Sequence, residues 1–417
     1  MKLNDIAEFV TDKISSSSIS LDRYVTTDSL LQNRRGREIA QNLPPVPCAL
    51  THYKQGDVLV ANIRPYLKKV WYADSEGGCS SDVLVFRAKN GHCSSFLYTV
   101  LMQDAFFDHA MSGAKGSKMP RGDKDQIMRY ELPTFTPTEE ENIGNMMVDI
   151  MSKIKVNRQI NDNLEAMAKQ LYDYWFVQFD FPNEEGKPYK SNGGVMVWNE
   201  DLHMSIPCTW NTCLLSDYIG SNNTGDWGFD EPAKKRSIKV GCIRGADIVK
   251  LNDLPIRYIK DNNTSKLLSA WDIVIEVSGG SPTQATGRSA FVTPGVLKRN
   301  GGNLTCSNFC HAFTMKDYKA SAYFYFMWRM FYDNNNMFNF EGKTSGIKNF
   351  MTDTFLANKW LDVPTALLDL FFERVKVIYE QIDNNIEEIN ALTKQRDELL
   401  PLLMNGQATV NYHLSAC

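Results

Sequence analysis

Lysine and arginine side chains gather at several points of the chain where glycine, serine and alanine stand beside them. Lysine and arginine neutralise phosphates, and the planar fork of arginine can also donate two hydrogen bonds to guanine. Small neighbours allow the backbone to approach a phosphate closely. We therefore take the following cations as candidate nucleic-acid contacts: Arg34, Arg35, Arg37, Lys115, Lys118, Arg121, Lys124, Lys234, Lys235, Arg236, Arg288, Lys343 and Lys348.

Each basic cluster, taken alone, is more typical of a solvated surface than of a binding site. The clusters recur, however, at corresponding places in both halves of the chain, just before Pro133 and Pro364. That correspondence leaves DNA binding and an ordinary charged surface as open alternatives. The net charge of −4 and the pI of about 5.9 argue mildly against nucleic acid. Net charge is a blunt measure, because a basic cleft can lie on an acidic body.

Two short motifs come close to catalytic signatures, and each lacks an essential residue. The Gly-Lys-Thr triplet at 342–344 would suit a phosphate-binding loop, but Met337 stands where that loop needs another glycine. Asp272 and Glu276 are spaced as in some nucleases, but Ser278 stands where a lysine would be needed. The sequence therefore predicts neither an NTPase nor a nuclease.

No catalytic residue, metal ligand or cofactor is predicted for this chain. Residues 42–46, Asn-Leu-Pro-Pro-Val, miss the adjacency and the aromatic residue of an adenine-methyltransferase motif. The nine cysteines include no Cys-x-x-Cys pair, which favours free thiols in a reducing compartment. The six histidines form no pair with metal-ligand spacing: His52, His92, His109, His203, His311 and His413.

The composition is that of an ordinary globular protein. The chain has 417 residues, of which 43% are hydrophobic and 23% charged. At roughly 100–200 residues a domain, this length suggests two to four units. The first ten residues have no apolar core of a signal peptide, and no stretch approaches the roughly 18 apolar residues of a membrane span. We expect a cytoplasmic protein with no membrane partner.

An internal repeat is the strongest pattern in the sequence. Six landmarks follow in the same order in both halves, and each half closes with a long helical segment. The insertions fall between landmarks, as surface loops would. Two unrelated α+β domains with common strand patterns are the alternative. The landmarks lie at 5–6, 56–60, 79–86, 96–98, 112–124 and 132–133, and again at 217–219, 271–275, 306–313, 323–325, 341–349 and 363–364.

The two helical segments carry matching heptad seams. Each has about 40 residues, roughly 60 Å at 1.5 Å per residue, so the two should pack together as an antiparallel coiled coil. A coil between two separate chains is the alternative. Thr138 is expected to cap the first helix. The seam residues are Ile143, Met147, Ile150, Ile154, Asn157, Asn161, Leu164, Ala168, Leu171 and Trp175, then Phe371, Val375, Ile378, Ile382, Asn385, Ile389, Leu392, Arg396, Leu399 and Leu403.

Four segments together resemble the specificity subunits of Type I restriction-modification systems. Residues 164–182, LEAMAKQLYDYWFVQFDFP, look like the central conserved region of that family. Residues 206–210, Ile-Pro-Cys-Thr-Trp, resemble the opening of its second recognition domain. Residues 344–349 look like the loop before its distal helix, and 399–406 like its ending.

The resemblance implies two target-recognition domains, each reading half of a bipartite double-stranded DNA site. It implies that the paired helices dock two methyltransferase subunits, and that restriction subunits join them. S-adenosylmethionine, ATP and magnesium would belong to those partners, and no catalysis to this chain. A fused methyltransferase-nuclease and a coiled-coil scaffold without DNA remain the alternatives, and the target bases stay open.

The expected architecture is α+β: two globular α/β target-recognition domains in a pseudo-two-fold repeat, separated by two long antiparallel coiled-coil helices. The expected boundaries are 1–136 for the first domain, 137–180 for the central helix, 181–205 for a linker, 206–363 for the second domain, 364–405 for the distal helix and 406–417 for the tail.

Overall fold

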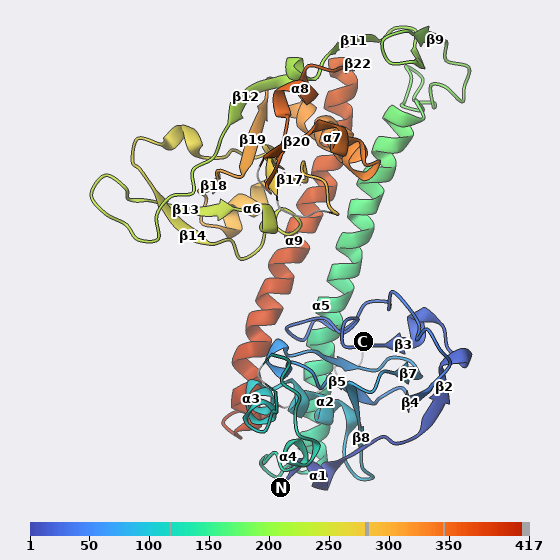
Figure 1. Cartoon of the computed structure of the whole chain (residues 1–417), viewed down its shortest axis with the longest axis vertical. Coiled ribbons are helices and arrows are strands. Elements are labelled where there is room, and N and C mark those ends of the chain that lie inside the picture. Colours follow the sequence, from blue (N-terminus) through green and yellow to red (C-terminus); the bar gives the residue numbers. More distant parts are fainter. Residues whose placement is uncertain (117, 280–282, 345–346, 411–417) are drawn as a thin grey trace. The chain divides into compact units, whose positions relative to one another are not determined.

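The computed structural model describes residues 1–116, 118–279, 283–344 and 347–410 (Figure 1). The chain divides into two compact units. Unit 1 comprises Met1–Asn157 with Glu388–Cys417, and unit 2 comprises Arg158–Glu387. Both units contain part of the two long helices, α5 (Pro137–Tyr172) and α9 (Thr365–Met404). The unit boundaries therefore lie within the helices and not in the segment 181–205.

Two four-stranded sheets and short helices form the globular part of unit 1. Strand β5 is buried along its whole length, and its Val-Leu-Val-Ala sequence suits a strand covered on both faces. The antiparallel sheet has the order β1-β8-β5-β6 (Ala7–Phe9, Val83–Ala88, Val58–Ala61, Val70–Tyr72). The other has the order β2-β4-β7-β3 (Lys13–Ser15, Ala49–Tyr53, Gly77–Cys79, Tyr24–Val25). The helices are α1 (Leu3–Ile6), α2 (Ser94–Met102), α3 (Asp104–Ser112) and α4 (Lys124–Met128).

Unit 2 repeats the first sheet with the order β12-β19-β15-β17 (Ile219–Asn223, Cys310–Met315, Ile273–Glu276, Ser289–Phe291). A second sheet has the order β14-β13-β18 (Ile256–Ile259, Ile238–Ile243, Leu304–Cys306), and a third β16-β21-β20 (Ser278–Gly279, Ile347–Phe350, Glu341–Thr344). Two pairs are β11–β22 (Asn211–Leu214, Lys359–Asp362) and β9–β10 (Met196–Asn199, Met204–Pro207). The helices are α6 (Pro294–Arg299), α7 (Ser321–Asp333) and α8 (Thr352–Leu356).

The predicted internal repeat is confirmed by the strand order and by details of the turns. In unit 1 the turn before β5 is closed by the Lys54 amide, which donates to Asp57 Oδ2 at 2.8 Å. In unit 2 the turn before β15 is closed by the Ser269 amide, which donates to Asp272 Oδ2, also at 2.8 Å. The parallel pair β3–β7 of unit 1 likewise corresponds to β13–β18 of unit 2.

The long helices pair in antiparallel fashion within each unit, as the matching seams predict. In unit 1, Asn157 Nδ2 donates to Glu388 Oε2 at 2.7 Å, and Arg396, further along α9, contacts Met151, earlier in α5. In unit 2, Asn385 Nδ2 donates to Asn161 Oδ1 at 2.8 Å. The seam residues that are fully buried are Ile143, Met147, Ile150, Ile154, Asn157, Ala168, Trp175, Phe371, Val375, Ile382, Asn385, Arg396 and Leu403. Those that are partly buried against the cores are Leu164, Leu171, Ile378, Ile389, Leu392 and Leu399.

One local expectation differs from the structure. Thr136, and not Thr138, caps α5: its hydroxyl accepts from the Glu139 amide at 3.3 Å, and Glu139 accepts from the Thr136 amide at 2.7 Å. Pro137 then occupies the first helical position, which needs no amide donor. The segment 181–205, which was expected to be a linker, contains strand β9, which pairs with β10.

Candidate nucleic-acid interface

Three loops of unit 1 are bound side by side through their backbones. The loop after β3 meets the loop after β5 where the Asn33 amide donates to Leu67 O at 2.9 Å. The loop after β5 meets the α3–α4 loop where the Arg64 amide donates to Pro120 O at 2.8 Å. We call the surface formed by residues 26–37, 62–69, 113–116 and 118–123 the loop edge of unit 1. Arg35, Lys115, Lys118 and Arg121 stand on these loops, whose backbones are hydrogen-bonded to one another.

The cations of this loop edge differ in how firmly the protein holds them. Arg121 is 60% exposed, and its Nη2 lies 3.0 Å from Asp82 Oδ1. An exposed pair of this kind contributes about 0–1 kcal/mol, so a phosphate can compete for the guanidinium. Lys115 pairs in the same exposed way with Asp123, at 3.2 Å. Arg35 and Lys118 are exposed and have no ion-pair partner among residues 1–116 and 118–157.

Arg34 and Arg37 have structural roles that the sequence pattern did not reveal. Arg34 is buried, and its guanidinium donates to Met102 O at 2.5 Å and to the Asp104 carboxylate. Releasing it to a phosphate would break both interactions, so its position speaks against DNA contact. Arg37 lies over the Trp71 ring, 4.4 Å from its centroid. Lys124 is exposed and lies 5.8 Å from the centroid of the Phe9 ring.

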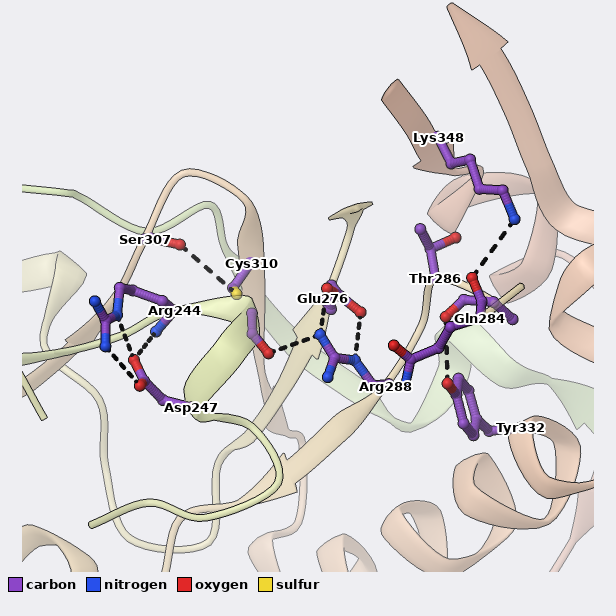
Figure 2. A network of polar contacts seen from close by, with 12 residues as sticks. Arg244, Asp247, Glu276, Gln284, Thr286, Arg288, Ser307, Cys310, Tyr332 and Lys348 are labelled. Atoms are coloured by element: carbon purple, nitrogen blue, oxygen red, sulfur yellow. Dashed lines mark hydrogen bonds and ion pairs between the residues drawn. The ribbon is translucent and has the colours of Figure 1, made fainter. Parts of the chain in front are cut away.

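The corresponding loops of unit 2 form the network in Figure 2. Arg288 donates through Nε and Nη2 to both oxygens of Glu276, at 2.8 and 2.7 Å, and Nη2 also donates to Gly245 O at 2.8 Å. The loop after β15 thereby holds the loop after β13. We call the surface formed by residues 244–247, 277–279, 283–288 and 347–350 the loop edge of unit 2.

Two candidate DNA contacts of unit 2, Arg288 and Lys348, are engaged in ion pairs and are largely shielded from solvent. Hydrogen bonds to Glu276 raise the pKa of Arg288 above its usual value, although burial opposes that shift. Lys348 is only 17% exposed, and its ammonium lies 3.0 Å from Glu341 Oε2. Breaking a buried pair costs about 3–5 kcal/mol, so phosphate does not readily displace such carboxylates. The side chain of Lys343 lies outside the described residues.

The cluster Lys234–Arg236 does not join this edge. It directly precedes β13, whereas Arg244 follows that six-residue strand, so the two lie roughly 20 Å apart. Lys234 and Lys235 are exposed, and Arg236 lies 4.4 Å from the centroid of the Phe229 ring. The sequence clusters of unit 2 are therefore distributed over both ends of one strand.

Sequence reasoning missed two arginines at the loop edges. Arg64 is exposed and has a left-handed φ of 53°, a conformation that costs a non-glycine residue about 1–2 kcal/mol. Arg244 follows β13 and pairs with Asp247. Both are single cations outside the basic clusters, so a criterion based on grouped lysines and arginines could not find them. Their places relative to the repeated strands were the available signal.

Metal-ligand and nuclease patterns can be checked in the residues that the structure describes. Within them, no group of three or more histidine, cysteine, aspartate or glutamate side chains could hold a metal ion. Asp272 and Glu276, which are spaced as in a nuclease, serve instead as a turn cap and as the partner of Arg288. The eight cysteines that the structure describes are free. No described helix is long and apolar enough to cross a membrane.

The chain is similar in sequence to known proteins of one class. No protein-family model matches the chain. The chain is 24% identical over 375 residues to the Type I restriction enzyme MjaIX specificity subunit of Methanocaldococcus jannaschii, which covers 87% of this chain and 80% of that one. It is 20% identical over 452 residues to the HindI specificity subunit of Haemophilus influenzae, with 97% and 98% covered.

The fold agrees with this sequence similarity. The crystal structure of the Type I restriction-modification S subunit from M. genitalium matches with a TM-score of 0.54 at 13% identity, over 97% of this chain and 95% of that one. Both curated relatives are named as specificity subunits, which does not favour a fused methyltransferase-nuclease or a scaffold. Over most of its length the chain is therefore similar in sequence to specificity subunits of Type I restriction-modification systems, and its fold matches that of such a subunit.

Proposed function

We propose that each unit reads one half of a bipartite double-stranded DNA site, and that the paired helices dock two methyltransferase subunits. Restriction subunits join the same assembly where the system has them. S-adenosylmethionine, ATP and magnesium belong to these partners, and the assembly works in the cytoplasm, where its DNA is.

One observation supports the proposal: the same strand order occurs twice, and the loop edge of each copy carries accessible arginines, Arg64 and Arg121 in unit 1 and Arg244 in unit 2. In unit 1 the loop after β5 carries Arg64 and lies against the segment that carries Arg121. In unit 2 the loop after β15 lies against β21, since the Phe350 amide donates to Val277 O at 2.8 Å. Two similar surfaces in one chain suit two half-sites, because one copy would suffice for a single site.

The proposal is tested by reconstitution. The chain should be purified alone and with methyltransferase subunits encoded beside it, then incubated with DNA and labelled S-adenosylmethionine. We expect methyl transfer only in the reconstituted complex, at a two-part sequence revealed by methylation-sensitive long-read sequencing. Methyl incorporation by the chain alone, or methylation by the complex without sequence preference, would contradict the proposal.

A further inference from the structure

Of the two arginines that the described part of the loop edge of unit 2 contains, Arg244 is the one whose guanidinium is both oriented and accessible. Its Nε donates to Asp247 Oδ2 at 2.7 Å and its Nη2 to Asp247 Oδ1 at 2.8 Å, as Figure 2 shows. The Arg244 side chain is 45% exposed, whereas that of Asp247 is only 12% exposed. The carboxylate therefore holds the guanidinium from the protein side.

The pairing leaves one fork of the guanidinium available. A guanidinium has five N–H donors, and Asp247 takes one on Nε and one on Nη2. Among the described residues, no acceptor is bound to Nη1 of Arg244. The remaining donors on Nη1 and Nη2 are coplanar and match the paired O6 and N7 acceptors of guanine in the major groove.

The backbone beneath Arg244 is fixed by the buried ion pair already described. Arg288 donates to Gly245 O at 2.8 Å, and a Cβ on Gly245 would lie only 2.8 Å from Glu276 Oε1. The Arg244 amide donates to Asp247 Oδ2 at 3.0 Å, which closes the turn. The side chain thus projects from a rigid turn, and less rotational freedom is lost when it binds.

The internal repeat places a different residue at the same point of unit 1. The Ser80 amide donates to Val25 O at 2.9 Å, as the Ser307 amide donates to Ile243 O at 2.8 Å, so Thr26 corresponds to Arg244. The turn after Thr26 is closed by Ser29, whose Oγ accepts from the Thr26 amide at 2.9 Å. The two units thus present a short hydroxyl and a long arginine fork on the same turn.

We propose that Arg244, oriented by Asp247, reads a guanine in the half-site of unit 2, and that unit 1 has no arginine contact at the corresponding position of its half-site. This inference rests on the proposed function and adds a residue and a base to it. A bare phosphate contact by Arg244 is the competing role, and the two differ in how they depend on sequence.

The test uses the complex of the full chain with its methyltransferase subunits. Binding is measured on duplexes in which each base pair of the methylated motif is replaced in turn, for the unaltered chain, Arg244→Ala, Arg244→Lys and the matched control Thr26→Ala. Loss of a bidentate contact should reduce discrimination at one G·C pair by about 10- to 100-fold. Arg244→Lys should retain overall affinity but lose most of that discrimination, because lysine has no fork.

The outcomes separate the inference from the proposed function. Relaxed preference at one guanine of a single half-site in both Arg244 variants, with Thr26→Ala leaving that position unchanged, supports the inference. Equal weakening on every duplex with a smaller salt slope overturns it in favour of a phosphate contact, as does an unchanged preference at every position. If the unaltered complex shows no sequence preference, the proposed function fails first. Matching melting temperatures of the variants exclude misfolding as the cause of lost discrimination.

Discussion

Units 1 and 2 share the order of their main sheet strands, yet they differ in the residues that follow those strands. Before β5, Gly56 has a φ of 87°, and the corresponding residue before β15 is Trp271 with a φ of 73°. Even a tryptophan is therefore held in a left-handed turn where the repeat requires one. The comparison teaches that strand order and turn geometry are retained between the units, while side chains at the loop edges are free to differ.

The largest difference in stability should appear between the variants of Arg288, which pairs with a buried carboxylate, and of Arg34, which pairs with an exposed one. Arg288→Ala leaves Glu276, 8% exposed, without its cation, and should cost about 3–5 kcal/mol of unfolding free energy. Arg34→Ala leaves Asp104, which is 63% exposed and keeps Lys68 at 2.7 Å, so the loss should stay below about 2 kcal/mol. Urea denaturation measures both.

The double variant Glu276→Gln with Arg288→Met serves as the control for this comparison. Removing both charges should restore most of the lost stability, because no buried charge is left unpaired. Equal losses for Arg288→Ala and Arg34→Ala would mean that burial of the carboxylate partner does not set the cost.

An intermediate loss of stability is expected when alanine replaces a glycine that allows close contact between a helix and its neighbour. Each unit has one such glycine. A Cβ on Gly144 of α5 would lie 2.5 Å from the backbone nitrogen of Phe96, and a Cβ on Gly295 of α6 would lie 2.2 Å from Cγ of Asp383 on α9. Substitution by alanine should cost about 1–3 kcal/mol, with the larger loss for Gly144, because a backbone atom cannot rotate away.

Gly342→Ala is the control for the two glycine variants, since the nearest atom to its Cβ would lie at 3.7 Å. Thermal unfolding of the three variants checks the order. A melting temperature of Gly144→Ala that equals that of Gly342→Ala would show that α2 and α5 separate easily.

The smallest expected effect is on DNA binding, and it distinguishes Arg121 from Lys348, which the sequence analysis gave the same role. Arg121→Ala should weaken DNA binding by up to about fivefold on all sequences, and lower the salt slope by about one, because an exposed pair yields to phosphate. Lys348→Ala should leave the salt slope unchanged, since Glu341 holds that ammonium. DNA affinity measured across salt concentrations checks both expectations. A reduced salt slope for Lys348→Ala would show that DNA opens the Lys348–Glu341 pair.

The repeat and the helix pair could be predicted because their signals are local and periodic. Seam positions such as Ile143 and Phe371 recur at heptad spacing, and burial follows that spacing directly. The pairing of the cations could not be predicted, because their partners lie far along the chain: Asp104 is 70 residues after Arg34. Arg244 was missed because it stands alone, although its turn is shared with the other unit.

The polar layer of the helix pair has a consequence for local unfolding. Asn157, which donates to the exposed Glu388, and the pair Asn161 and Asn385 occupy the seam where the unit boundaries fall. Side-chain amides there take the place of the leucine and isoleucine burial found elsewhere along the seam, so opening this stretch exposes little apolar surface. We therefore expect the backbone amides of 157–161 and 385–388 to exchange with deuterium before those of the helix turns on either side. The most readily opened part of each long helix would then lie in its middle and not only at its ends.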